Sequence, residues 1–296
     1  GMGKTFFENF AEAKAVSQEA DDLLHQSLSK LIFWGPEADL VQTKNAQTAI
    51  FVTSLALLRV LQKELPILTP KAAAGLSLGE YTALVAAEKI AFPEALLLVR
   101  RRGELMQEAA QKHPGTMAAV LGLKAGDVED LLRPIQENEQ VYPANFNTPG
   151  QVVISGTFSG IEKASRLLKE AGAKKIVLLP VSGAFHSGLM EEAGKALLPD
   201  LEKLVFLDSA IKLIMNVPGA FVEDKAEIKS NLAQQVTQPV CWQKGIEALD
   251  RFGTTFFLEI GPGKTLTAMN RKIAPAGQSF SLENLDDLKK LQQEVV

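Results

Sequence analysis

The spacing of apolar residues along this chain alternates between two periods. Segments with apolar residues at every third or fourth position, which predict amphipathic helices, are separated by short β-rich runs. The clearest of these runs lie at 151–155, 175–179 and 254–260. Helices interleaved with short strands favour an α/β architecture, and we find no internal repeat.

The segment 113–183 differs in pattern from its flanks. Its predicted elements are a strand at 117–120, a helix at 125–136, a strand at 151–155, a helix at 161–171 and a strand at 175–179. This β-α-β-α-β order predicts a small ferredoxin-like subdomain, and glycine and proline mark both of its edges. We therefore expect a discontinuous core, 1–112 and 184–296, with this subdomain inserted.

Length and composition bound the class of protein. The chain has 296 residues, 46% of them hydrophobic, which is enough for one large globular unit or for a core with a smaller insert. Its formal net charge is -4 with charges of both signs interspersed, which argues against a nucleic-acid partner because phosphates need a basic face. Cys241 is the only cysteine, so no internal disulfide can form. We find no secretory segment and no apolar run long enough to cross a bilayer, and we expect a soluble, cytoplasmic protein.

The stretch Gly75-Leu76-Ser77-Leu78-Gly79 carries the strongest chemical signal. It follows three alanines, 72–74, and opens a helical segment that continues to Ala87. Strand, sharp turn and helix in this order form a nucleophile elbow, in which only glycine fits tightly on either side of the strained serine and the hydroxyl stands beside the first helical amide. Ser77 is therefore the candidate nucleophile. An ordinary turn rich in glycine and serine is the alternative that the motif alone leaves open.

A nucleophilic serine needs a base, and the chain has three histidines. His25 lies on the polar face of an early helix, and His113 precedes a proline in an exposed turn. His186 follows the apolar strand at 175–179, and catalytic residues of α/β folds gather where strands end. We take His186 as the candidate base, with a structural histidine bonded to nearby backbone as the alternative.

Three consecutive arginines, 100–102, lie in a segment that we expect to be a helix. This helix starts after Pro93, a residue suited to the first position of a helix. Periodicity places Arg102 within an apolar face and points Arg100 and Arg101 toward solvent. The apolar face consists of Ala95, Leu98, Val99, Leu105, Met106 and Ala109. A buried guanidinium cannot shed its charge, so Arg102 must meet a carboxylate, either from the protein or from a substrate.

Together these segments resemble the malonyl-coenzyme A:acyl carrier protein transacylases, over nearly the whole chain. The matching segments are 75–84, 102–107, 145–153, 183–187, 235–242 and 259–264. The resemblance implies an α/β fold with a hydrolase-like core, containing a short parallel sheet, and a ferredoxin-like α+β subdomain. It also implies an acyltransferase that moves a malonyl group from coenzyme A to the phosphopantetheine thiol of acyl carrier protein, in fatty acid synthesis, through an ester on Ser77.

The resemblance implies roles for individual residues. His186 would act as general base and then as acid, and Arg102 would hold the free carboxylate of malonate. Gln235 matches the position whose backbone carbonyl orients the histidine, and the backbone amide of Leu78 would donate to the oxyanion. Phe185 resembles the malonyl-preferring form of its motif, because its bulk would crowd a substituent at C2.

No cofactor or metal is expected, since the chain offers no ligand cluster, and coenzyme A enters as part of the substrate. We expect a monomer. Acyl carrier proteins are acidic, so we expect basic residues to dock the carrier. The candidate basic residues are Lys174, Lys175, Lys264, Arg271 and Lys272, with ordinary solvated surface charges as the alternative. Asn145 and Asn147, which precede Pro149-Gly150, are expected to form a turn.

The sequence departs from the family in two places. The family opens with a strand and a Pro-Gly-Gln-Gly-x-Gln loop, whose glutamine supplies a second oxyanion amide, before the residues that match Gly1 and Met2. That segment is absent here, which implies weakened turnover and an exposed sheet edge. Leu76 stands where many relatives carry histidine, and we expect a small effect because that position is not the base.

Three alternative functions fit parts of the sequence. A serine esterase or thioesterase uses the same elbow but places its histidine late in the chain, and no histidine follows His186. A phosphate-binding loop at 261–265 lacks its first glycine, because Leu258 stands in that position. A weakly active or non-catalytic relative that binds acyl-coenzyme A or the carrier is the alternative that only activity can exclude.

Overall fold

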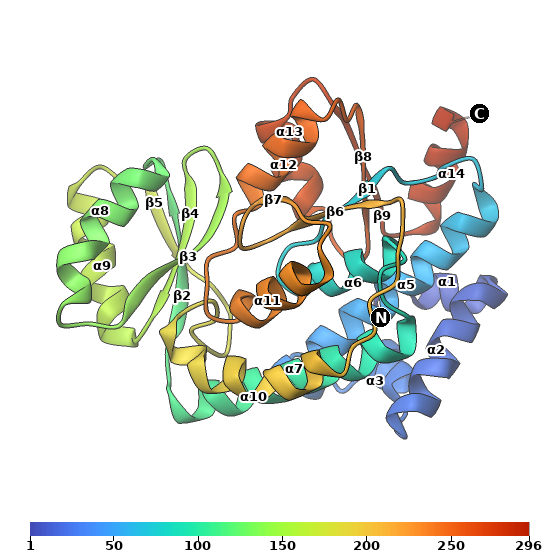
Figure 1. The fold of residues 1–296 in the computed structure, drawn as a ribbon, viewed down its shortest axis with the longest axis horizontal. Helices are drawn as coiled ribbons and strands as arrows, with labels where there is room; N and C mark the ends of the chain where they lie inside the picture. The colour runs from blue at the N-terminus through green and yellow to red at the C-terminus, as the bar shows by residue number, and fades with distance from the viewer. Residues whose placement is uncertain (296) are drawn as a thin grey trace. The chain divides into compact units, whose positions relative to one another are not determined.

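The computed structural model describes residues 1–295, which divide into two compact units (Figure 1). The first unit contains residues 1–103, 204–213 and 249–295, and the second contains 104–203 and 214–248. The segment predicted to be ferredoxin-like, 113–183, lies wholly within the second unit. Each unit is described separately below.

The first unit is mostly helical. Its helices are α1 (Lys4–Asn9), α2 (Ala11–Leu24), α3 (Leu28–Trp34), α4 (Glu37–Leu40), α5 (Thr43–Glu64), α6 (Gly79–Ala86), α13 (Thr265–Ile273) and α14 (Leu285–Val295). Helix α7 (Phe92–Lys112) begins in this unit and continues into the second.

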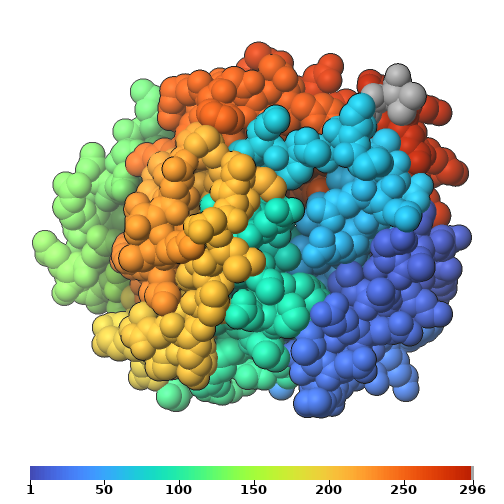
Figure 2. All heavy atoms as spheres, turned by 45° about the vertical axis from the view of Figure 1, so that its right-hand side comes forward, coloured from blue at the N-terminus to red at the C-terminus, as the bar shows by residue number. Residues whose placement is uncertain are grey.

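Helix α5 is the core of the first unit. Its side chains are buried on nearly all sides, with Phe51 and Val60 fully enclosed, as expected of a helix that is apolar around its circumference. Helices α2 and α6 pack against it. In Figure 2 the dark blue surface of the N-terminal helices adjoins the lighter blue surface of the residues that follow. Helix α5 therefore supports the segments that carry the site described below.

Two pairs of parallel strands complete the first unit. Strand β1 (Ala72–Ala73) pairs with the first residues of β6 (Lys212–Met215), and β8 (Phe256–Ile260) pairs with β9 (Gln278–Leu282). Parallel pairing of segments distant in sequence is the short parallel sheet expected of the core. Strand β1 leads directly into the turn before α6, so the predicted strand, turn and helix are all present.

The second unit contains a four-stranded antiparallel sheet in the order β3-β4-β2-β5. In chain order its elements are β2 (Thr116–Leu121), α8 (Ala125–Gln136), β3 (Val141–Thr148), β4 (Gln151–Gly156), α9 (Phe158–Glu170) and β5 (Lys175–Leu178). The two helices pack on the sheet around fully buried residues such as Val128, Leu132 and Leu168. The order β-α-β-β-α-β is ferredoxin-like.

Strand β3 was not predicted from the sequence, and the placement of Asn145 and Asn147 in a turn is wrong. Both asparagines lie within β3, and the turn is formed by Pro149 and Gly150, whose φ is 77°. The pairing of β3 with β4 shifts register on either side of Asn145. These irregularities admit Pro143 and two asparagines, residues that strands usually exclude.

The remaining elements of the second unit follow the sheet. They are a 3-10 turn (Gly188–Met190), α10 (Glu191–Glu202), β7 (Ala220–Phe221), which pairs antiparallel with the end of β6, α11 (Lys225–Gln235) and α12 (Trp242–Arg251), which ends in the first unit. Among residues 1–295, no helix has the length and apolar character needed to span a bilayer.

Candidate active site

The turn between β1 and α6 has the geometry of a nucleophile elbow. Ser77 has a backbone φ of 53°, in the left-handed region that residues with a Cβ seldom adopt. The amide of Gly79 donates to the carbonyl of Leu76 at 2.9 Å, and the amide of Glu80 donates to the carbonyl of Ser77 at 3.1 Å. The chain thus turns directly into α6. Backbone strain of this kind is typical of functional turns.

The two glycines of the motif differ in their steric role. A Cβ at Gly75 would overlap the backbone carbonyl of Gly79, so only glycine fits there. A Cβ at Gly79 would meet no atom within 4 Å. The expectation that the turn requires glycine on both sides of Ser77 is therefore correct for Gly75 and wrong for Gly79.

Leu78 follows the serine with a helical backbone, φ −53° and ψ −39°. The first amides of a helix have no partner within the helix, and the helix dipole favours negative charge beside them. The amide of Leu78 is therefore chemically suited to stabilise an oxyanion formed next to Ser77.

Arg102 lies on the buried face of α7, as its periodicity predicts, with 1% of its surface exposed. Its Nη2 donates to the Oγ of Ser77 at 3.1 Å, and its Nη1 donates to the Oε1 of Gln47 on α5. The guanidinium is thus placed directly beside the candidate nucleophile. Arg101 is exposed, whereas Arg100 is half-buried and donates to Asn45 at 3.0 Å, so only Arg101 fits the expected solvent-facing position well.

Two neighbours of Arg102 come from the first turn of α6. Tyr81 is fully buried, and its ring centroid lies 5.4 Å from the guanidinium carbon of Arg102. Burial raises the pKa of Tyr81 to about 12, although the charge of Arg102 opposes this shift. Burial lowers the pKa of Arg102, and Tyr81 and the fully buried Glu80 oppose that shift. Arginine keeps its charge in proteins, so the first unit holds a cation at the nucleophile.

His186, the candidate base, lies in the second unit and is 3% exposed. Its backbone φ is 56°, and its Nδ1 lies 2.7 Å from the backbone carbonyl of Gln235, the last residue of α11. Because a carbonyl can only accept, Nδ1 carries a proton, and in the neutral ring Nε2 then keeps its lone pair. This is the tautomer that a general base requires. His25 ends α2, and His113 pairs with Glu192 at 3.6 Å.

Gln47 and Tyr81 are site residues that the sequence did not reveal. Gln47 is a neutral polar residue on a long apolar helix, and Tyr81 reads as one more apolar position of α6. The available signals were weak: Tyr81 lies in the helix that directly follows Ser77, and Gln47 adjoins the buried positions of α5.

Comparison with known proteins places this geometry in a family. The acyl transferase domain family matches residues 1–281. The malonyl CoA-acyl carrier protein transacylase of Bacillus subtilis is 43% identical over 274 residues, which cover 92% of this chain and 86% of the relative. That of Haemophilus influenzae is 35% identical over 94% of this chain and 89% of the relative. This chain belongs to the malonyl CoA-acyl carrier protein transacylase family.

Solved structures of transacylases in this family have the same fold. The Streptococcus pneumoniae structure superposes with a TM-score of 0.95 at 37% identity, covering 99% of this chain and 95% of that one. A malonyl-transacylase solved with a type II polyketide synthase acyl carrier protein superposes equally well, at 0.95 and 34% identity, over 99% of this chain and 95% of that one. The chain is therefore an acyltransferase by family, which removes the esterase alternative.

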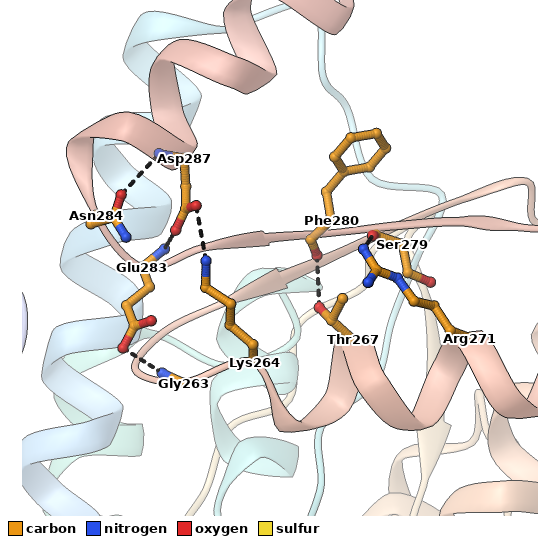
Figure 3. Close-up of polar contacts among 9 residues, drawn as sticks. All are labelled: Gly263, Lys264, Thr267, Arg271, Ser279, Phe280, Glu283, Asn284 and Asp287. Atoms are coloured by element: carbon orange, nitrogen blue, oxygen red, sulfur yellow. Dashed lines mark hydrogen bonds and ion pairs between the residues drawn. The ribbon is translucent and has the colours of Figure 1, made fainter.

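The family motif at 259–264 has a structural role in this transacylase (Figure 3). The amide of Gly263 donates to Glu283 at 2.9 Å, and Lys264 pairs with Asp287 at 3.1 Å. Arg271 donates to the carbonyl of Ser279 at 2.9 Å. The glycine turn thus binds a carboxylate of the protein itself, and Lys264 and Arg271 are engaged in holding the end of the chain.

Lys174 and Lys175 differ from those two candidate docking residues. Both are exposed, and both line a hollow between α9 and β5 in the second unit. Lys169 lines the same hollow. Lys272, the remaining basic residue expected to dock a carrier protein, is exposed on α13.

Proposed function

We propose that this chain transfers a malonyl group from malonyl-coenzyme A to the phosphopantetheine thiol of an acyl carrier protein, supplying fatty acid synthesis. The relatives described above carry this activity in their names, and one of them was solved with an acyl carrier protein. The observation that carries the proposal is the buried guanidinium of Arg102, which donates to the Oγ of Ser77 at 3.1 Å. A neutral acyl group needs no cation there, whereas the free carboxylate of a malonyl thioester does.

In the first half-reaction, Ser77 is acylated. Its Oγ attacks the thioester carbonyl while Nε2 of His186 takes the hydroxyl proton, and the amide of Leu78 donates to the resulting oxyanion. When the tetrahedral intermediate collapses, the carbon–sulfur bond breaks and the protonated His186 returns the proton to the coenzyme A thiolate. The products are a malonyl ester on Ser77 and free coenzyme A.

In the second half-reaction, the carrier thiol takes the malonyl group. His186 removes the thiol proton, the sulfur attacks the ester carbonyl, and the carbon–oxygen bond to Ser77 breaks. His186 then returns the proton to the serine. The carbonyl of Gln235 keeps the imidazole in the required tautomer throughout, although it stabilises the imidazolium less than a carboxylate would. Ser77 and His186 belong to different units. We infer their pairing from their chemical roles and from the family, and measurements of activity test it.

Substrate selection falls to two residues in this proposal. Arg102 binds the carboxylate of the malonyl group through its planar guanidinium. Phe185 is half-buried against the cluster formed by Met117, Ala119, Ala144 and Val153, and its ring would crowd a methyl group at C2. The proposed enzyme therefore prefers malonyl over methylmalonyl thioesters. We further propose a cytoplasmic monomer that needs no cofactor beyond its coenzyme A thioester substrate.

Product formation tests the function directly. Incubation with malonyl-coenzyme A and a holo acyl carrier protein should yield malonyl carrier protein, detected as a mass increase on the phosphopantetheine arm. The Ser77→Ala variant should yield none. Binding of the carrier or the thioester without transfer would instead favour a non-catalytic relative.

A further inference from the structure

We infer that Tyr81 is a positioning residue that fixes the guanidinium of Arg102 for carboxylate recognition, and so contributes to selectivity for malonyl over uncharged acyl groups. The inference rests on the proposed function. Nothing in the motif at 75–79 requires an aromatic residue two positions after it, so this role comes from the structure alone.

The geometry singles out the ring of Tyr81. The guanidinium carbon of Arg102 lies 5.4 Å from the ring centroid, within the range at which a cation is attracted to an aromatic face. Tyr81 is 0% exposed and Arg102 is 1% exposed, so water does not screen this attraction. The ring thus supports the guanidinium from one side, and Gln47 anchors Nη1.

Helix α6 links this contact to the nucleophile. Ser77 and Tyr81 are four residues apart, and the amide of Tyr81 donates to the carbonyl of Leu78 at 3.0 Å in the first turn. The residue that attacks the thioester therefore lies in the turn that leads into α6, and the residue that supports Arg102 lies in the first turn of that helix.

An aromatic support suits this role better than a second carboxylate. A carboxylate held against Arg102 would compete with the substrate for the same N–H groups, whereas the face of a ring leaves the edges of the guanidinium able to donate. The ring face of Tyr81 therefore supports the cation from one side.

The test compares charged and uncharged reagents on the full chain. Rates of Ser77 modification are measured with malonyl-coenzyme A, with acetyl-coenzyme A and with phenylmethanesulfonyl fluoride, for wild type, Tyr81→Leu and Tyr81→Phe. We expect Tyr81→Leu to slow malonylation about tenfold, and Tyr81→Phe, which keeps the ring, to stay within about twofold of wild type. Acetylation and sulfonylation should change less than about twofold in both variants.

Two further variants keep the test decisive. Tyr81→Met fills the buried site with a flexible side chain if Tyr81→Leu unfolds, and it should show the same selective loss. In an Arg102→Ala background, Tyr81→Leu should cause no further loss of malonylation, because the residue it positions is gone.

Three results would overturn the inference. Equal losses with all three reagents would show that Tyr81 only supports the fold. A loss in Tyr81→Phe as large as in Tyr81→Leu would assign the effect to the hydroxyl. If Tyr81→Leu slowed malonylation in the Arg102→Ala background as much as in the wild type, Tyr81 would not act through Arg102. Each of these needs a wild-type chain that reacts with malonyl-coenzyme A, whereas a wild type that forms no malonyl ester would overturn both this inference and the proposed function.

Discussion

In the proposed function, Arg102 is the residue that distinguishes charged from uncharged acyl groups. Burial of a guanidinium is costly unless its charge and its donors find partners, and in the first unit Arg102 donates to the side-chain carbonyl oxygen of Gln47 and to the hydroxyl of Ser77, with Glu80 nearby. A substrate carboxylate would complete this environment with a full negative charge. In the proposed function, the preference for a dicarboxylic half-thioester over an uncharged acyl group then follows from electrostatics.

Removing this charge should change the choice of substrate. We expect Arg102→Ala to reduce kcat/KM for malonyl transfer by about 100-fold, because charge-assisted hydrogen bonds to the carboxylate are lost, while acetyl transfer is unchanged or rises. Steady-state kinetics with both thioesters measure this ratio. Arg101→Ala, which removes a neighbouring exposed arginine, serves as the control. Parallel losses for malonyl and acetyl groups would show that Arg102 is structural.

The sequence pointed to those candidate site residues whose chemistry is rare in the chain. Ser77 lies in a recognisable turn, His186 is one of three histidines, and Arg102 is a charge on an apolar face. Gln47 and Tyr81 escaped prediction because neither is unusual for its helix, and their role depends on α5, α6 and α7 meeting around one guanidinium. Tertiary contacts of this kind leave no periodic signal.

At the scale of single elements, the elbow depends on one close backbone approach. Gly75 permits it, whereas Gly79 lies where a side chain would meet no neighbour. The motif Gly-x-Ser-x-Gly therefore contains one glycine that the turn requires and one that it does not. In the same way, β3 was missed because its local composition suggests a turn, while its pairing with β4 overrides that preference.

Matched substitutions separate the two glycines. Gly75→Ala should destabilise the protein by about 3 kcal/mol or prevent folding, because the new methyl group overlaps the backbone of α6. Gly79→Ala should be neutral or stabilise by up to about 1 kcal/mol, since alanine is favoured in helices. Urea denaturation measures both free energies. Equal destabilisation by the two variants would contradict the steric distinction.

The C-terminal elements suggest a second test of element stability. Both oxygens of Glu259, on β8, accept amide hydrogens from the start of α13, from Leu266 at 3.0 Å and Thr267 at 2.7 Å. We expect Glu259→Leu to lower the free energy of unfolding by about 1–2 kcal/mol, because these amides lose a charged cap. Glu294→Leu, near the end of α14, is the control for removing a glutamate, and thermal unfolding distinguishes the variants. No difference between them would show that the cap contributes nothing.

At the scale of the whole molecule, the candidate nucleophile and the candidate base belong to different units. Ser77, Leu78 and Arg102 belong to the first, and His186 and Gln235 to the second. The contact between Arg102 and Ser77 lies within the first unit, and the contact between His186 and Gln235 lies within the second. The alternation of helices and strands was sufficient to predict the α/β class, whereas the extent of each unit depends on long-range contacts that a single sequence does not display.

Recognition of the carrier protein also belongs to this scale. We expect Lys174→Glu combined with Lys175→Glu to raise the apparent KM for an acidic carrier several-fold, to roughly tenfold at low salt, because opposite charges steer association. The KM for malonyl-coenzyme A should stay unchanged. Lys30→Glu combined with Lys63→Glu makes the same charge change on exposed residues of the first unit. An equal increase in the KM for both substrates would show that Lys174 and Lys175 do not dock the carrier.

The most direct test of the central claim is intact-protein mass spectrometry of this chain after mixing with malonyl-coenzyme A. We predict a covalent malonyl adduct that peptide mapping places on Ser77, and its absence from the Ser77→Ala variant. A folded chain that gains no adduct, or one whose adduct persists in Ser77→Ala, would contradict the assignment of Ser77 as the residue that carries the malonyl group.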